Sequence, residues 1–318
     1  MMSHLLMILG GVVVLVGGGE LLVRGAAALA RALGISAMVV ALTVVALGTS
    51  APELVVCAMA ALRSNVGICG GNVVGSNILN ILLVAGATAA IYPLQSTATF
   101  VRREVPIMIG ISCLFFVLVW DGELSRIDAG LLLIVLAAYM AFAVQIARRE
   151  KAQIAESFAE DRLIPRGGSA LINLILLGVG LVLLSGGSEL FLRGAIGVAR
   201  GVGVSDEMIG LTLVAFGTSI PELAASLIAA YRKHPDICLG NLVGSNIYNI
   251  AAIAGISGVI RPLPFNDEML HVHLPVMVFA AFLLWPMVAQ GLKVSRREGA
   301  VLLASYSLYL GWTIYHRA

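Results

Sequence analysis

Two short polar stretches, GTSAPE at residues 48–53 and GTSIPE at residues 217–222, interrupt long apolar runs of this sequence. Each places a glutamate, Glu53 or Glu222, inside a segment that would otherwise read as an uncharged membrane helix. The two glutamates are 169 positions apart, and the flanking glycine, threonine, serine and proline residues repeat at the same offset. This doubled motif is the feature from which the rest of the chain can be understood.

The composition is that of a membrane protein. Of 318 residues, 59% are hydrophobic and 12% are charged, whereas ordinary soluble domains carry about 25% charged residues. The mean hydropathy is +0.99, and many apolar runs approach the roughly 20 residues that cross a bilayer. These properties predict an all-α polytopic membrane protein embedded in the lipid bilayer. We expect its first apolar run to be a retained span and expect no nucleic-acid partner.

Ten membrane spans are predicted, in two sets of five. The first set covers residues 5–33, 36–62, 66–91, 105–120 and 127–146, and the second covers 170–199, 208–231, 237–260, 273–290 and 299–315. This division gives an N-terminal five-helix repeat at 1–146, a short polar linker at 147–168 and a C-terminal five-helix repeat at 169–318.

The offset of 169 extends far beyond the glutamate motif. It also pairs Glu20 with Glu189, Arg24 with Arg193, Gly34 with Gly203, Pro93 with Pro262 and Pro106 with Pro275. Because five is an odd number of spans, the second set enters the membrane from the opposite side. The sequence therefore predicts an inverted-topology repeat, an architecture typical of secondary transporters.

The basic residues of the loops predict the orientation of the chain. With the N-terminus outside, thirteen Lys and Arg residues fall in inside loops and five in outside loops. Positive residues concentrate on the cytoplasmic side of membrane proteins. We therefore expect the N- and C-termini outside, the linker in the cytoplasm, and the protein in the plasma (cell inner) membrane.

The motif itself predicts a break in the helix. Serine followed three residues later by glutamate, as in Ser50 to Glu53, is the pattern of a capping box, and proline suits a first helical turn. The second span is thus expected to be two half-helices that meet at mid-membrane, and Ser219 to Glu222 predicts the same for the seventh. The third and eighth spans, with the inserts GNVVGSN at 71–77 and GNLVGSN at 240–246, are expected to be irregular at the same depth.

These segments offer a set of oxygen ligands and nothing softer. Asn80 lies four residues after Ser76, on the same face of a helix, and Asn249 stands likewise to Ser245. Ca²⁺ takes six to eight hard oxygen ligands, whereas zinc and copper prefer histidine or thiolate. The candidate cation ligands are Glu53, Glu222, Thr49, Thr218, Ser50, Ser219, Ser76, Ser245, Asn80, Asn249 and the backbone carbonyls of Ala46 and Ala215.

Both copies of GTSxPE and of GNxVGSNIxN resemble the α-repeats of the sodium/calcium exchanger family, within the cation/calcium exchanger superfamily. The resemblance covers essentially the whole chain and is closest to the compact prokaryotic members. It implies exchange of Na⁺ for Ca²⁺ at the ligands named above, without a prosthetic group. We expect a monomer to be sufficient for transport, and the oligomeric state stays open. Asn249 stands where some members have aspartate, which leaves two carboxylates rather than three and leaves the ion stoichiometry open.

Three other functions remain open on the residues alone. Glutamates inside a membrane can relay protons, so a proton-coupled exchanger is an alternative. A cation channel with a glutamate-lined pore is disfavoured by the tandem repeats, and an intramembrane hydrolase lacks a Ser-His or Asp-Asp pair. Away from the site, Glu20 with Arg24 and Glu189 with Arg193 are spaced for intrahelical ion pairs.

Overall fold

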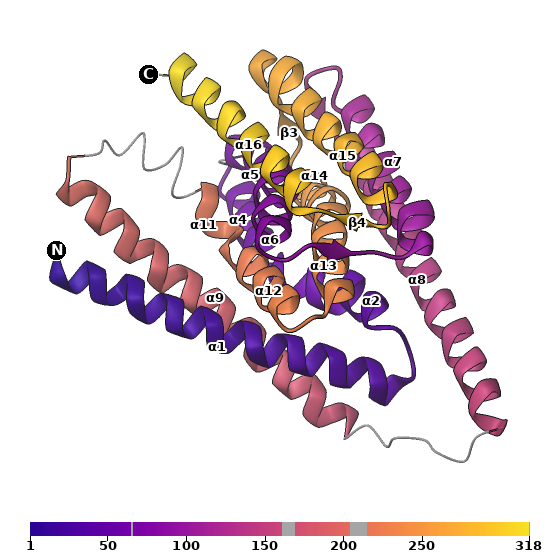
Figure 1. Ribbon diagram of the computed structural model, residues 1–318. Coiled ribbons are helices and arrows are strands. Elements are labelled where there is room, and N and C mark those ends of the chain that lie inside the picture. Colours follow the sequence, from indigo (N-terminus) through magenta and orange to yellow (C-terminus); the bar gives the residue numbers. More distant parts are fainter. Residues whose placement is uncertain (65, 161–168, 204–214, 318) are drawn as a thin grey trace.

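The computed structural model of the protein describes residues 1–64, 66–160, 169–203 and 215–317, and this part of the chain is almost entirely helical (Figure 1). The first half consists of α1 (Met2–Leu33), α2 (Ala37–Val40), the π-helical turn η1 (Ala41–Val45), α3 (Ala46–Thr49), α4 (Ala51–Leu62), α5 (Gly67–Leu79), the π-helical turn η2 (Asn80–Ala85), α6 (Gly86–Ile91), the π-helical turn η3 (Phe100–Glu104), α7 (Val105–Leu118) and α8 (Arg126–Glu160).

The second half repeats this order. It consists of α9 (Ala170–Gly201), α11 (Ala215–Thr218), α12 (Ile220–Tyr231), α13 (Pro235–Tyr248), the π-helical turn η5 (Asn249–Ala254), α14 (Gly255–Ile260), the π-helical turn η6 (Met269–His273), α15 (Leu274–Ala289) and α16 (Arg296–Arg317). The bounds of α3, α4, η2 and α6 recur 169 positions later in α11, α12, η5 and α14. The sequence repeat is therefore also a repeat of local backbone structure, including its irregular turns.

Several helices are long and apolar enough to cross a membrane. Six of the described helices meet this condition by length and composition. A seventh span is obtained if α2–α3 and α4, which are bent by 45° at Ser50, are counted together. Part of the predicted span 208–231 lies outside the described residues. The prediction of a polytopic helical protein is thus confirmed, whereas the count of ten spans stays a prediction.

The start of the predicted polar linker, at residue 147, lies inside a helix, because α8 continues to Glu160. The added segment is rich in Ala, Glu, Arg, Lys and Gln, which are strong helix formers and need no burial to stay helical. Within this extension, the Glu150 carboxylate accepts hydrogen bonds from the Ser36 backbone N (2.9 Å) and hydroxyl (3.2 Å), and so contacts the start of α2.

Two pairs of very short strands join the halves. β1 (Leu94–Gln95) pairs antiparallel with β4 (Lys293–Val294), with Leu94 opposite Val294. β2 (Glu123–Leu124) pairs antiparallel with β3 (Leu263–Pro264), with Leu124 opposite Leu263. Each strand therefore finds its partner in the other half, an exchange that a two-fold arrangement of the halves produces.

The centre of the bundle is formed by α13 and η5. Every residue from Ile237 to Gly255 is buried, and α13 packs against α12, α2, η1 and α3. Small residues permit this close packing: a Cβ on Gly244 would lie 2.6 Å from the Cβ of Ala46. The polar inserts of the second half are thereby enclosed by protein rather than exposed to lipid.

Helices α1 and α9 lie side by side along one edge of the bundle, next to α12 (Figure 1). Their contact depends on glycines seven residues apart. A Cβ on Gly11 would lie 2.7 Å from the backbone N of Phe191, one on Gly18 would lie 2.8 Å from that of Leu184, and one on Gly25 would lie 2.7 Å from that of Leu177. The partner positions fall as the glycine positions rise, so the two helices are antiparallel with backbones in direct contact.

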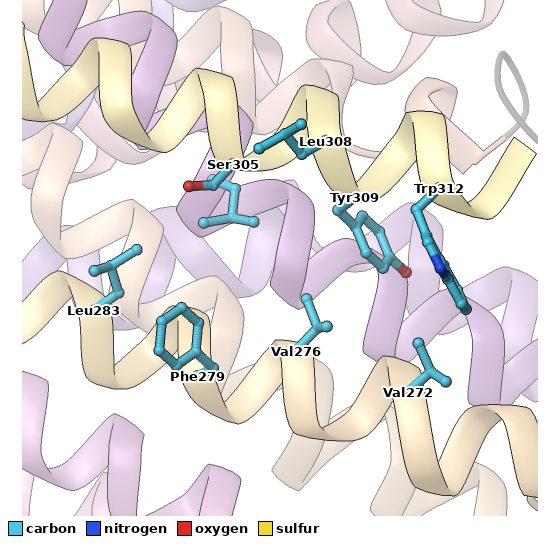
Figure 2. Close-up of a pocket in the computed structure, with 9 residues that line it drawn as sticks. Val272, Val276, Phe279, Leu283, Ser305, Leu308, Tyr309 and Trp312 are labelled. Carbon is cyan, nitrogen blue, oxygen red and sulfur yellow. The ribbon is translucent and has the colours of Figure 1, made fainter. Parts of the chain in front are cut away.

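An apolar groove lies between α15 and α16, away from the polar motifs. Figure 2 shows that Val276, Phe279 and Leu283 of α15 face Ser305, Leu308 and Tyr309 of α16. Its side chains are almost all hydrocarbon, with Ser305, Tyr309 and the Trp312 ring as the polar contributors. The groove therefore lacks the oxygen-rich lining that a cation requires, and the candidate site must be sought elsewhere.

Candidate cation site

Glu53 and Glu222 begin the helices that follow the two interruptions. Each lies in the first turn of its helix, α4 or α12, directly after a proline. Both side chains are only 1% exposed, and Oε2 of each has no hydrogen-bond partner among the described residues. Unpaired buried carboxylate oxygens are costly, because they have lost water and gained no donor. Such oxygens are suited to contact a cation.

The predicted capping boxes were wrong. Ser50 and Ser219 do occupy the N-cap positions of α4 and α12, but neither side chain caps its helix. The Ser50 hydroxyl instead donates a 3.3 Å hydrogen bond to Oε1 of Glu222, in the other half. The Ser219 hydroxyl is fully buried and without a hydrogen-bond partner in the described chain. Both serines are thus turned away from local capping, and Ser50 reaches the opposite carboxylate.

The predicted amide ligands stand where the helix geometry changes. Asn80 is the first residue of η2 and Asn249 the first of η5, so each π-helical turn begins at a candidate ligand. Both are 1% exposed, and Oδ1 of each lacks a partner among the described residues. π-Helical turns inside α-helices are frequent at functional sites, because the extra residue per turn displaces side chains from their regular positions.

Serines lie one helical turn before these amides. Ser76 is 3% exposed and Ser245 is fully buried. The Ser245 hydroxyl is 3.4 Å from the Thr49 hydroxyl, which belongs to the other half. The structure therefore brings Ser245 close to the GTSAPE motif of the first half.

The remaining predicted ligands surround the ends of α3 and α11. The Ala46 carbonyl accepts a 3.1 Å hydrogen bond from the Ser50 backbone N, the ordinary bond of a helical turn, and also lies 3.3 Å from the Thr49 hydroxyl. Thr218 is half-buried, engaged in a polar interaction and ends α11, which begins at Ala215.

Asn241, which was not among the predicted ligands, is part of this network. Asn241 is 1% exposed, and its Oδ1 accepts a 3.0 Å hydrogen bond from the Thr49 hydroxyl. Its Nδ2 is 3.4 Å from the Ser226 hydroxyl. The repeat equivalent, Asn72, donates instead to the Cys57 thiol at 3.2 Å. The signal was present in the sequence, since both asparagines recur at the offset of 169, but their side-chain partners lie on other helices.

The donor set fits a hard cation. In the described part of the chain, the buried oxygens without a partner include Glu53 Oε2, Glu222 Oε2, Asn80 Oδ1, Asn249 Oδ1 and Ser219 Oγ. No group of three or more His, Cys, Asp or Glu side chains gathers anywhere in the described residues. Two carboxylates with neutral amide and hydroxyl oxygens suit Ca²⁺ or Na⁺ and not a thiophilic metal. The fold is thus that of a helical membrane protein with hard oxygen donors buried in both of its related halves.

Comparison with known proteins gives the family. Residues 3–145 and 172–315 match the family described as sodium/calcium exchanger protein. Sodium/calcium exchanger MaX1 of Methanosarcina acetivorans is 32% identical, with 96% of this chain and 97% of that protein covered. The inner membrane protein YrbG of Escherichia coli strain K12 is 32% identical, with 86% of each chain covered.

Comparison with solved structures indicates the same family. The solved structure of the sodium/calcium exchanger from Methanococcus jannaschii matches this chain with a TM-score of 0.83, at 33% identity and with 98% of both chains covered. The chain belongs to the sodium/calcium exchanger family, which confirms the resemblance read from its motifs. It is a membrane protein of the cation/calcium antiporter class and not an enzyme.

Proposed function

We propose that this protein exchanges Na⁺ for Ca²⁺ across the plasma membrane by alternating access. The observation that carries the proposal is the burial of Glu53 and Glu222, each with an unpaired carboxylate oxygen among the described residues, together with the Ser50–Glu222 hydrogen bond that joins the two motifs. The ligands would be the side chains of Glu53, Glu222, Thr49, Thr218, Ser50, Ser219, Ser76, Ser245, Asn80 and Asn249, with the carbonyls of Ala46 and Ala215.

The charge of the proposed site permits an exchange of three Na⁺ for one Ca²⁺ and determines how much charge such an exchange would move. One Ca²⁺ with ionised Glu53 and Glu222 makes a neutral site, whereas three Na⁺ ions in the same place leave one net positive charge. Because Asn249 is neutral, it adds an oxygen without altering this balance. An exchange of three Na⁺ for one Ca²⁺ would therefore move one elementary charge in each cycle, which the membrane potential acts upon.

The proposed topology is ten spans in two inverted repeats of five, at residues 1–146 and 169–318. The termini would lie outside and the segment 147–168 in the cytoplasm, as the loop charges favour. The cross-paired strands are consistent with this arrangement, since each half supplies one strand to each pair. The name of the Escherichia coli relative supports placement in the inner membrane.

The solved relative supports the identity of the ions. Structures of the sodium-calcium exchanger NCX_Mj were obtained after soaking with Na⁺ and with Ca²⁺ or Sr²⁺, and they concern extracellular ion exchange and binding-site occlusion. This chain matches those structures with a TM-score of 0.82. Its candidate site has the hard oxygen donors that these three cations share.

A flux measurement tests the proposal. Purified protein in liposomes loaded with Na⁺ is diluted into Na⁺-free medium with radioactive Ca²⁺, at equal pH on both sides. We expect Ca²⁺ uptake that depends on the outward Na⁺ gradient and is abolished by Glu53→Gln or Glu222→Gln. Glu123→Gln, in the surface strand β2, is the matched control and is expected to transport normally.

The same liposomes separate the competing functions. Uptake that follows a pH gradient and ignores Na⁺ would mean a proton-coupled exchanger. Unitary currents far above a transporter's turnover would mean a channel. Normal exchange in either glutamate variant would show that the ions pass elsewhere.

A further inference from the structure

An ion pair joins α1 to the helix that carries Glu222. Oε2 of Glu20, on α1, is 2.7 Å from Nε of Arg232, which directly follows α12. Oε1 of the same carboxylate pairs with Arg24, one turn further along α1. Two guanidinium groups thus share one carboxylate that is only 19% exposed. The sequence predicted the pair within α1 but not the contact with Arg232.

The repeat-equivalent contact is absent from the described structure. Glu189, the counterpart of Glu20, pairs with Arg193 of its own helix at 2.6 Å. Its side chain is 56% exposed. The counterpart of Arg232 by position is Arg63, which follows α4, is exposed and has no ion pair in the described part of the chain. The repeat therefore offers two equivalent ion pairs, Glu20–Arg232 and Glu189–Arg63, of which the described structure contains only Glu20–Arg232.

The helices around these contacts are packed with the same asymmetry. Both α1 and α9 pack against α12, and neither has a comparable contact with α4. A Cβ on Gly19 of α1 would lie 2.9 Å from Ile228 of α12. On α4, the equivalent of Ile228 is Met59, which is exposed, as are its neighbours Val55 and Val56. The helix pair thus covers α12 but not its repeat equivalent α4, although it also touches α2, η1 and α3 of the first half.

The helix pair is suited to move as one body. Its glycines place the backbones of α1 and α9 in direct contact along their length, as described above. A displacement that carries α1 off α12 therefore carries α9 with it, toward α4. In an inverted repeat, α9 and α4 are the counterparts of α1 and α12. Replacing the α1–α12 contact by an α9–α4 contact therefore gives the first half the packing that the second half has now.

We propose that Glu20–Arg232 and Glu189–Arg63 are alternate latches, each formed in one access state and broken in the other. The described state has the Glu20–Arg232 latch closed, on the side that the loop charges assign to the cytoplasm. In the opposite state, the helix pair rests on α4, Glu189 binds Arg63, and Arg232 is released to solvent. The latches bind neither the transported ions nor a proton. They change only the relative populations of the two access states.

This inference rests on alternating access in the proposed function, but it makes a separate prediction about populations. Removing Arg232 weakens the described state alone, and removing Arg63 weakens the opposite state alone. The two substitutions therefore shift the equilibrium in opposite directions. A purely structural role for either arginine has no reason to produce opposite signs.

Hydrogen–deuterium exchange in lipid nanodiscs can measure the shift, by comparing the segments 51–62 of α4 and 220–231 of α12. The variants are Arg232→Gln, Arg63→Gln as its repeat-matched counterpart, and Arg232→Lys, which keeps the charge. We expect Arg232→Gln to raise exchange in α12 and lower it in α4, each by roughly two- to fivefold, as befits a half-exposed ion pair. Arg63→Gln should do the reverse, and Arg232→Lys should resemble the unmodified protein.

Two outcomes would overturn the inference. One is a shift of the same sign in Arg232→Gln and Arg63→Gln, and the other is no shift in either. If Arg232→Gln does not fold, the sign of the shift in Arg63→Gln decides alone.

Ca²⁺ flux in the same variants keeps this test apart from the proposed function. All predicted ligands remain in them, so Na⁺-driven uptake persists if the function is right, whichever way the latches behave. Opposite exchange shifts without Na⁺-driven uptake would support the latches and contradict the Na⁺/Ca²⁺ assignment.

Discussion

The Thr49 hydroxyl lies 3.0 Å from the amide oxygen of Asn241 and so connects α3 of the first half to α13 of the second. Asn241 is held in turn by the Ser226 hydroxyl on α12. A candidate ligand therefore takes its orientation from a residue that is not itself a candidate ligand. The Asn241 oxygen is the nearer of the two acceptors of the Thr49 hydroxyl, at 3.0 Å against 3.3 Å for the Ala46 carbonyl, and donation to it leaves the lone pairs of the hydroxyl for a cation.

Replacing Asn241 with leucine should weaken cation binding without removing a ligand. The loss of a buried hydrogen-bond acceptor costs about 1–3 kcal/mol. We expect the half-saturating Ca²⁺ concentration of exchange to rise roughly five- to a hundredfold as a result. Thr49→Val combined with Asn241→Leu should be less severe than the product of the two single effects, because both remove the same interaction.

Thr88→Val is the control for that cycle. The Thr88 hydroxyl is buried and donates to the Val84 carbonyl of its own helix at 2.7 Å, away from the candidate ligands. It should leave the Ca²⁺ dependence unchanged. If the effects of Asn241→Leu and Thr49→Val on the free energy of Ca²⁺ binding were strictly additive, Asn241 would not orient Thr49.

Gly18→Val should separate α1 from α9. A Cβ at Gly18 would lie 2.8 Å from the Leu184 backbone N and 3.0 Å from the Gly180 carbonyl oxygen, neither of which can turn aside. Overpacking of this kind costs about 1–3 kcal/mol. We expect a lower melting temperature and slower exchange. Gly17→Val is the neighbouring control, because a Cβ there would meet no atom within 4 Å; equal effects of the two would show that backbone contact is not the cause.

Asn249→Asp should make Ca²⁺ binding more sensitive to pH. It would add a third carboxyl group to the proposed ligand set of Glu53 and Glu222, and three buried carboxylates around one Ca²⁺ leave a negative charge that a proton can neutralise. The half-saturating Ca²⁺ concentration, measured at pH 6.5, 7.5 and 8.5, should vary more steeply in the variant than in the unmodified protein. Identical pH dependence would mean that residue 249 does not face the ions.

Exchange should respond to membrane potential. With three Na⁺ leaving for each Ca²⁺ entering, one positive charge leaves the liposome, so an inside-positive potential favours Ca²⁺ accumulation. One elementary charge is worth about 2.3 kcal/mol per 100 mV, which corresponds to a roughly fiftyfold change in the final Ca²⁺ ratio. The potential can be set with K⁺ and valinomycin. Accumulation that does not change with potential would indicate two Na⁺ per Ca²⁺.

The repeat made much of this molecule predictable from its sequence. The offset of 169 placed both interruptions, and the bounds of α4 and α12 follow it without a shift. Glu53, Glu222, Asn80 and Asn249 were chosen because charged and amide groups inside apolar segments need a polar partner. All four are buried, each with an unpaired oxygen among the described residues. Local pattern and membrane physics were sufficient for these features.

What the sequence could not supply is which helices meet. Ser50 fits a capping box locally, yet it bonds Glu222 of the other half, because tertiary contact overrode the local alternative. Glu20 was correctly paired with Arg24, but its second partner, Arg232, lies far along the chain. Gly17 and Gly18 look alike in sequence, and only the position of α9 distinguishes them.

The exchanged strands set an order on how the chain can fold. β1 is made early in synthesis, but its partner β4 immediately precedes the last helix, and β2 likewise waits for β3. Neither half contains the partners of its own strands. A first half released from the ribosome therefore has two strands, β1 and β2, whose backbone hydrogen-bonding groups are unpaired. The first half can therefore complete its strand pairs only after the second half has been inserted into the membrane. We expect the two halves, expressed as separate chains, to accumulate when they are produced together and to be degraded when either is produced alone.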